Sequence, residues 1–273
     1  MCSPARDALR RAYPDHVWSR ARHGGSYSGA EVWRLAGDEG LYVKIVEEWG
    51  GPDPGASPLA EAERLAWLRG QNVPCPQVVD AGVIEEWEYL VTREAPGRAA
   101  CEEWPAHRRM DVVDALADFA RDLHALPVDA CPFDRTLKTT APAAQEIAAL
   151  GEVDMNSLDP RRRGWSSTRL ILEMLTAARQ VGREEPAVCH GDYCLPNVLL
   201  DPDTLRVTAV VDTGRAGVAD RYQDLALATR SLADAGLNVQ FGPEHAARFL
   251  YRYGESPVDV ERIDFYRLLD EFF

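Results

Sequence analysis

Apolar and polar positions alternate in different ways in the two parts of the chain. In the first part the pattern predicts strands over residues 30–35, 41–46 and 88–93, and the turn sequence AGDEG joins the first two. A helix is predicted to begin at Pro58, with Ser57 as its N-cap, and to end at Gly70. This part is therefore expected to be a small, strand-rich lobe with one helix.

After Gly97 the apolar residues recur at helical spacing instead. The spacing predicts helices over residues 105–126, 165–180, 220–233, 243–253 and 258–270. Short apolar runs lie between them in AVCHGD, NVLL and RVTAVVD. We therefore expect an α+β chain with an N-terminal lobe (1–94), a hinge (95–97) and a mainly helical C-terminal lobe (98–273). Ligands often bind in the cleft between two such lobes.

The composition excludes several classes of protein. No apolar stretch approaches the ~18 residues of a membrane span, and the N-terminal residues lack the apolar run of a signal peptide. The six cysteines form no C-x-x-C pair and no H-E-x-x-H motif occurs, so we expect reduced cytoplasmic thiols rather than disulfides or zinc. A net charge of −14 argues against nucleic acid and anionic membranes as partners, and it permits a cationic ligand. We expect a monomer or a weak dimer.

One short polar segment carries the strongest chemical signal. Asp192 follows His190 and Gly191, Asn197 comes five residues later, and Asp212 begins a D-x-G sequence twenty residues after Asp192. Turn-rich loops collect polar residues for structural reasons, so the H-G-D triplet alone is a weak signal. The full order and spacing match a protein-kinase catalytic centre, in which a carboxylate serves the acceptor hydroxyl and hard oxygen donors hold Mg²⁺. The spacing therefore predicts phosphoryl transfer.

Lys44 is an unusual residue for its position. It lies in the apolar run LYVKIV, and only two of the 30 basic residues of the chain are lysines. A lone strand lysine is ordinarily a surface charge. Here, however, Glu61 lies on the leucine-bearing side of the next predicted helix, where an unpaired buried carboxylate costs roughly several kcal/mol, so we expect an ion pair with Lys44. Glu63 lies on the same helix, and helical geometry alone leaves the choice between the two open.

Other polar residues are better explained by structure than by chemistry. The glycines of HGGSYSGAEVW, residues 23–33, suit a turn close to phosphates, but their spacing is not G-x-G-x-x-G and no Walker-type motif occurs. His124 lies on an otherwise apolar predicted helix and is expected to be a hydrogen-bonded core residue. Asp220 and Asp224 are expected to cap a helix or to brace the polar segment around Asp192.

Three segments of the chain resemble the aminoglycoside phosphotransferases, most of all the 3′-phosphotransferases of kanamycin and neomycin. The segments are CHGDYCLPNVLLDP, VVDTGRAGVADRYQDLAL and the terminal LLDEFF, and the resemblance extends over nearly the whole chain. It implies a bilobal, protein-kinase-like α+β fold. It also implies that the γ-phosphate of ATP is transferred, with Mg²⁺ present, to a hydroxyl of a cationic aminoglycoside, which confers antibiotic resistance.

The resemblance further implies roles for particular residues. Asp192 is the expected catalytic residue, and the expected Mg²⁺ ligands are Asn197 and Asp212. Contacts with ATP are expected from Lys44, Glu61 and Ser28 and from the backbone of Arg93 and Ala95. Contacts with the aminoglycoside are expected from Asp159, Arg215, Asp234, Asp270, Glu271 and the Phe273 carboxylate. Asp270 and Glu271 lie at a predicted helix C-terminus, which disfavours negative charge, so we expect a bound cation beside them.

Some features depart from the family pattern and leave alternatives open. Thr213 stands where the family usually has leucine, and residues 232–244, which include Asp234, also depart from the pattern. The sequence CLPN resembles the streptomycin 3″-phosphotransferases, whereas the ending LLDEFF favours the 3′ type. Streptomycin 3″-phosphorylation, phosphorylation of another cationic metabolite and a nucleotide-binding pseudokinase scaffold are therefore the alternatives. The joint presence of Lys44, Asp192, Asn197 and Asp212 argues against the scaffold.

Overall fold

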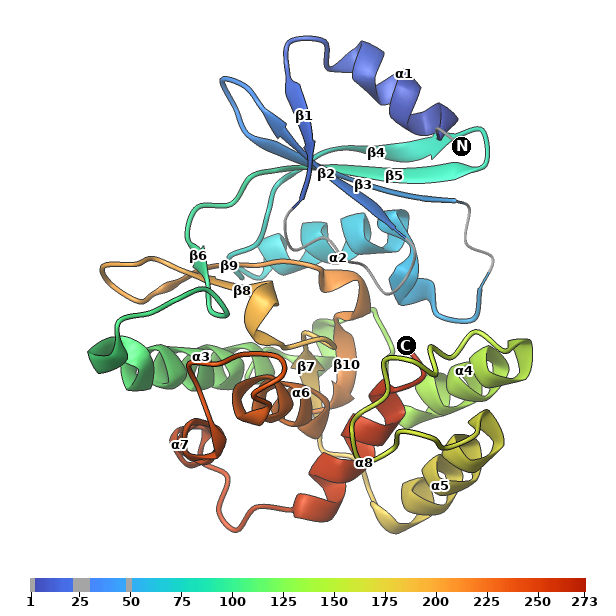
Figure 1. Ribbon diagram of the computed structural model, residues 1–273, viewed down its shortest axis with the longest axis vertical. Coiled ribbons are helices and arrows are strands. Elements are labelled where there is room, and N and C mark those ends of the chain that lie inside the picture. The colour runs from blue at the N-terminus through green and yellow to red at the C-terminus, as the bar shows by residue number, and fades with distance from the viewer. Residues whose placement is uncertain (1–2, 22–29, 48–50) are drawn as a thin grey trace.

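The computed structural model describes residues 3–21, 30–47 and 51–273, which form a small N-terminal lobe and a larger helical lobe (Figure 1). The N-terminal lobe contains a five-stranded antiparallel sheet in the order β1-β2-β3-β5-β4. Its strands are β1 (Val17–Arg20), β2 (Glu31–Ala36), β3 (Leu41–Glu47), β4 (Val78–Ile84) and β5 (Trp87–Arg93). Two helices accompany the sheet, α1 (Pro4–Ala12) and α2 (Pro58–Gly70). Figure 1 shows that α2 lies between the sheet and the other lobe.

Helix α2 begins and ends where its sequence predicts. The Ser57 hydroxyl accepts a hydrogen bond from the Ala60 N–H (3.2 Å), and Pro58 occupies the first turn, where its missing N–H costs nothing. Leu65 and Leu68 are buried, so the apolar side of the helix packs into the core. The cap and the buried leucines together fix which side of α2 faces the rest of the lobe.

The C-terminal lobe combines six helices with two small antiparallel sheets in the described part of the chain. The helices are α3 (Arg109–His124), α4 (Leu137–Leu150), α5 (Ser167–Gln180), α6 (Tyr222–Ala233), α7 (Pro243–Tyr253) and α8 (Val260–Asp270). One sheet pairs β7 (Pro186–Cys189) with β10 (Gly217–Asp220). The other sheet has the order β6-β8-β9, with strands β6 (Arg98–Ala99), β8 (Val198–Leu200) and β9 (Val207–Val210).

The structure has the predicted two-lobed α+β organisation, but the sequence pattern misses six helices and strands of the described chain. They are α1, α4, β1, β4, β6 and β10. Helix α4 contains Pro142 in its interior, which ordinarily interrupts a helix. Strand β4 contains Asp80 and Gly82, which break the apolar alternation, and β10 has only four residues. For α4, β4 and β10 local preference is therefore weak, whereas α1 begins with an ordinary cap at Ser3 and Pro4.

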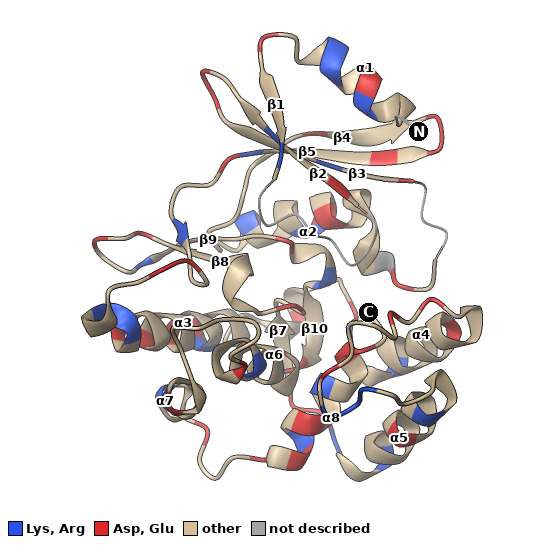
Figure 2. Ribbon diagram, viewed as in Figure 1, with Lys and Arg blue, Asp and Glu red and all other residues tan. Residues whose placement is uncertain are grey.

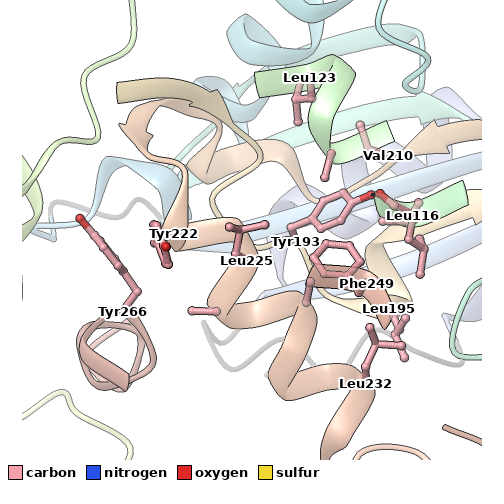
Figure 3. Packing of buried hydrophobic residues seen from close by; sticks show 14 of the residues in the cluster. Leu116, Leu123, Tyr193, Leu195, Val210, Tyr222, Leu225, Leu232, Phe249 and Tyr266 are labelled. Carbon is pink, nitrogen blue, oxygen red and sulfur yellow. Dashed lines mark hydrogen bonds between the residues drawn. The ribbon is translucent and has the colours of Figure 1, made fainter. Parts of the chain in front are cut away.

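The core of the C-terminal lobe fixes the polar segment that follows β7. Figure 3 shows Tyr193 packed among Leu116, Phe249 and neighbouring apolar side chains. Its ring is 2% exposed, and its hydroxyl donates a hydrogen bond to the Leu116 carbonyl (2.8 Å). Because Tyr193 directly follows Asp192, the core restrains the backbone at the predicted catalytic residue.

Basic and acidic residues are distributed over both lobes (Figure 2). Cys75, Cys101, Cys131, Cys189 and Cys194 are free thiols. No helix in the described ranges is both long and apolar enough to cross a membrane.

Candidate active site

The predicted catalytic loop, residues 190–197, joins β7 to β8. Gly191 has φ +85°, and a Cβ there would lie 2.2 Å from the Arg215 carbonyl oxygen, so only glycine fits. The Asp224 carboxylate accepts hydrogen bonds from the N–H groups of His190 (2.7 Å) and Gly191 (2.9 Å). Asp224 therefore braces the loop, and His190 connects it to the residue that follows β9 through a 3.0 Å contact between Nε2 and the Val211 carbonyl.

Within this loop, the side chains of Asp192 and Asn197 contact each other. Asn197 Nδ2 donates to Asp192 Oδ2 (2.9 Å) and to the Asp192 carbonyl (3.0 Å), which leaves Oδ1 as the amide atom available to a cation. Burial raises the pKa of Asp192, and the nearby Asp270 and Asp212 carboxylates raise it further. Arg215 offsets this only in part. Asp192 is thus a stronger base than an exposed aspartate.

Lys44 contacts two carboxylates, Glu61 of its own lobe and Asp212 of the C-terminal lobe. Its Nζ lies 2.9 Å from Glu61 Oε2 on α2 and 2.7 Å from Asp212 Oδ1. Glu61, not Glu63, is therefore the helix partner, because Glu61 is buried while Glu63 is exposed. Burial alone lowers the pKa of Lys44, but the two carboxylates raise it well above its usual value. The ammonium group therefore remains charged, and it lowers the pKa of Asp212 in turn.

A cavity of about 770 Å³ lies between the lobes beside these groups. Its lining includes most of the residues predicted to bind ATP or Mg²⁺: Lys44, Glu61, Arg93, Ala95, Asn197 and Asp212. The predicted phosphate contact Ser28 lies outside the described residues. We refer to this space as the nucleotide cavity.

The donor set in the nucleotide cavity fits Mg²⁺. The Asp212 carboxylate and the Asn197 amide oxygen are hard donors, and Asp212 keeps Oδ2 available because Lys44 binds Oδ1. A second group in the described chain, His124, Cys189 and Asp224, brings three ligand-type atoms within 4.8 Å of one another. Hydrogen bonds account for it, since His124 Nδ1 meets the Tyr253 hydroxyl (2.8 Å) and Nε2 meets Asp224 (3.1 Å). His124 is thus the hydrogen-bonded core residue that its sequence position indicates.

A second cavity of about 490 Å³ lies on the other side of the segment 212–215. Its lining contains all six residues predicted to contact the aminoglycoside: Asp159, Arg215, Asp234, Asp270, Glu271 and Phe273. The lining also contains Asp154, from the acidic stretch 154–160 that the resemblance assigns to the acceptor lid. No motif marks four further charged lining residues: Asp53, Glu152, Arg163 and Arg230. We refer to this space as the acceptor cavity.

The acidic residues at the end of α8 already have cationic partners within the chain. Asp270 pairs with Arg230 (2.5 Å), and Arg215 approaches it to 3.9 Å. Glu271 pairs with Arg162 (3.1 Å) and accepts a hydrogen bond from the Asp159 N–H. Arginines on other segments therefore offset part of the charge of these carboxylates, and their contact with a cationic acceptor stays a prediction.

Thr213, the departure from the family pattern, is fully buried between the two cavities. Its hydroxyl has no hydrogen-bond partner among the described residues. A buried, unpaired hydroxyl destabilises the folded state.

Residues 20–266 of the chain match the phosphotransferase enzyme family. The chain belongs to this family. An aminoglycoside 3′-phosphotransferase of Streptomyces fradiae is 46% identical over 97% of this chain and 98% of its own length. A streptomycin 3″-kinase of Streptomyces griseus is 38% identical over 89% of this chain and 88% of its own length.

Solved structures agree with this assignment. The crystal structure of an aminoglycoside-3′-phosphotransferase of type VIII superposes with a TM-score of 0.89, at 47% identity and with 98% of each chain covered. The predicted bilobal kinase-like fold, the resemblance to aminoglycoside phosphotransferases and the assignment as a phosphotransferase are thus confirmed.

Proposed function

We propose that this protein transfers the γ-phosphate of ATP to the 3′ hydroxyl of a kanamycin- or neomycin-type aminoglycoside and thereby confers resistance. One observation carries the proposal. The segment 212–215 borders the nucleotide cavity through Asp212 and the acceptor cavity through Arg215, and Asp192 is close enough to both for their charges to shift its pKa. A phosphate donor in one cavity and a hydroxyl in the other would meet at Asp192.

The polar groups then have definite parts in the transfer. Asp192, oriented by the Asn197 amide, accepts the proton of the acceptor hydroxyl, and its raised pKa favours that step. Lys44, held between Glu61 and Asp212, binds the nucleotide phosphates. Asn197 and Asp212 would hold Mg²⁺, which when bound would supply positive charge to offset that of the transferred group.

The remaining nucleotide contacts belong to the same proposal. The backbone of Arg93, the last residue of β5, and of Ala95 binds the base, and Ser28 contacts the phosphates. Arg93 and Ala95 border the nucleotide cavity, which supports the first of these contacts. The carboxylate of Phe273 is assigned to the acceptor for the same reason, since Phe273 borders the acceptor cavity.

The charge of the acceptor cavity supports a cationic acceptor. Its lining has seven acidic residues, namely Asp53, Glu152, Asp154, Asp159, Asp234, Asp270 and Glu271. It has three basic ones, namely Arg163, Arg215 and Arg230. Glu152, Asp154 and Asp234 form no ion pair with a described basic side chain, so their charge is available to ammonium groups of an aminoglycoside.

A coupled assay of ADP release with Mg²⁺ and ATP tests the proposal directly. We expect turnover with kanamycin and none with a 3′-deoxy analogue of kanamycin, because the analogue lacks the accepting oxygen. Turnover of the analogue would exclude the 3′ position. Absence of turnover with every aminoglycoside would exclude the function.

Streptomycin 3″-phosphorylation is the second candidate. The sequence CLPN and the relative that is named a streptomycin 3″-kinase, at 38% identity, favour it. The 46% identity to a 3′-phosphotransferase favours the first candidate more. Streptomycin in the same assay separates them, since it has no kanamycin-type 3′ hydroxyl and its turnover would reverse the order.

We further propose that the protein acts in the cytoplasm, where ATP is available, as a monomer or a weak dimer. The five cysteines within the described ranges are free thiols, which supports a reducing compartment. Light scattering coupled to size-exclusion chromatography measures the oligomeric state.

A further inference from the structure

Asp53 belongs to the N-terminal lobe by sequence, but its carboxylate contacts two arginines of the C-terminal lobe. It sits between β3 and α2 and is only 3% exposed. Its Oδ1 accepts hydrogen bonds from Arg135 Nη1 (2.6 Å) and from the Gly55 N–H (3.0 Å), while its Oδ2 accepts one from Arg215 Nε (3.1 Å). Both arginines belong to the C-terminal lobe.

This buried carboxylate depends on its two arginines for its charge. Burial by itself raises the pKa of Asp53, but Arg215 and Arg135 outweigh that effect and lower the pKa to about 2. Asp53 is therefore ionised at neutral pH. Breaking this ion pair is costly, because it would leave a buried charge without a partner.

Arg215 carries the contact from Asp53 onward to the acceptor cavity. Its Nη1 lies 3.9 Å from Asp270 Oδ1, and its guanidinium lies 5.5 Å from the centre of the Phe273 ring. Asp192 and Asp212 are also close enough to stabilise its positive charge. Four carboxylates thus attract one guanidinium, and Asp53 is the one that it contacts through a hydrogen bond.

The N-terminal lobe contacts the same segment at several further points. Lys44 contacts Asp212 (2.7 Å), and the Arg64 side chain of α2 donates to the Ala216 carbonyl (2.9 Å). Gly214 packs so closely on Gly55 that a Cβ at Gly214 would lie 2.2 Å from the Gly55 carbonyl oxygen. Residues 212–216, between the two cavities, therefore contact the N-terminal lobe at both ends and in the middle.

We propose that Asp53 is a positioning residue of the acceptor site, which keeps the Arg215 guanidinium away from the carboxylates that receive the acceptor. Without the Asp53 charge, Arg215 would move toward Asp270 and Asp192, where it would compete with an ammonium group of the acceptor. The N-terminal lobe thus shapes the acceptor cavity through Asp53, whose carboxylate oxygens are taken up by Arg135, Arg215 and the Gly55 N–H. The inference rests on the proposed cationic acceptor and extends it to a residue outside the known motifs.

The test is a double-mutant cycle in the full-length protein, with D53N, R215Q and the double variant, measured with kanamycin and ATP. We expect D53N to raise KM for kanamycin about tenfold, as for the loss of one charge-assisted interaction, with KM for ATP and kcat within twofold of wild type. In the R215Q background, D53N should change KM for kanamycin by less than twofold, because no guanidinium remains to be misplaced. Equal effects of D53N in both backgrounds would overturn the proposal.

Two further variants separate positioning from general stability. R135Q removes the other arginine but leaves Asp53 paired with Arg215, so KM for kanamycin should stay within twofold of wild type. A rise as large as that of D53N would mean that any disturbance of this cluster harms the site. D114N is the matched control, because it breaks an Asp–Arg pair with Arg248 in a different part of the lobe. It should leave both KM values unchanged.

The design remains decisive if D53N does not fold. D53E then takes its place, since it keeps the charge but moves the carboxylate by one methylene, and its effect must again depend on Arg215. Failure of the proposed function is a separate result, because it appears as wild-type protein without kanamycin turnover. If wild type phosphorylates streptomycin instead, the same cycle is measured with streptomycin.

Discussion

The two cavities of this protein are built on different plans. Around the nucleotide cavity, two pairs join residues that are close in the sequence, Lys44 with Glu61 and Asp192 with Asn197, while Lys44 also contacts the distant Asp212. The acceptor cavity is assembled from segments far apart in the chain, around residues 53, 159, 215, 234 and 270. Sequence spacing therefore places much of the first site and little of the second.

The difference also appears in how charge is compensated. In the nucleotide cavity, Lys44 forms ion pairs with both Glu61 and the half-exposed Asp212. In the acceptor cavity, arginines of the chain already pair with Asp53, Asp270 and Glu271. The charge that attracts an acceptor is therefore smaller than the number of carboxylates indicates. Substitutions in the two cavities should accordingly have effects that differ in magnitude and in the kinetic constant that changes.

The largest effect is expected from D192N, where the two cavities meet. An amide cannot accept the hydroxyl proton, so kcat should fall by about 10²–10⁴. The side chain keeps its shape and can still accept from Asn197, so ATP affinity should remain near wild type. Steady-state kinetics and calorimetric titration with a non-hydrolysable ATP analogue measure the two quantities. Turnover near the wild-type rate would remove Asp192 from the mechanism.

A smaller loss is expected from K44R on the nucleotide side. One compact ammonium contacts both Glu61 (2.9 Å) and Asp212 (2.7 Å), and a wider planar guanidinium does not fit the same space. Misplacing one charge-assisted contact should lower kcat/KM for ATP about 10- to 100-fold. The control is K138R, because Lys138 is the other lysine and is exposed. Equal kinetics for K44R and wild type would make Lys44 an ordinary structural charge.

The sequence predicts the nucleotide side well because its chemistry imposes spacing. A carboxylate, an amide five residues later and a second carboxylate after a hairpin are placed by local structure alone. The choice between Glu61 and Glu63 could not be made in this way. It depends on how α2 is rotated against β3, which is set by packing of Leu65 and Leu68 in three dimensions.

The acceptor side is less predictable for a physical reason. Asp53 lies in GPDPGA, which reads as an ordinary turn, and its partners Arg135 and Arg215 are 82 and 162 residues away. No periodicity or motif connects residues at such separations. The resemblance to a family named six lining residues, but it could not indicate which of their charges are offset by arginines of the chain.

A modest effect is expected from D234N in the acceptor cavity. Asp234 has no arginine partner in the described chain, so its loss removes attraction for the acceptor without releasing a buried arginine. KM for kanamycin should rise by up to about fivefold, since an exposed ion pair contributes roughly 0.2–1 kcal/mol, with kcat and KM for ATP unchanged. D203N, on an exposed turn beyond β8, is the control. An unchanged KM for kanamycin would place Asp234 outside the acceptor site.

The smallest effect, one on stability alone, is expected from T213V in the segment that separates the cavities. Thr213 is 0% exposed, and its hydroxyl has no partner among the described residues. Valine has the same shape without the hydroxyl, so the change removes a desolvation cost and should stabilise the fold by about 1 kcal/mol. For a chain of this size that corresponds to a rise in Tm of roughly 2–4 °C, measured by calorimetry. T213S keeps the hydroxyl but loses the methyl group, so its Tm should fall. If T213V instead lowers Tm, the hydroxyl has a hydrogen-bond partner in solution. If T213V changes either KM, the segment between the cavities is part of the site and does not merely separate the two cavities.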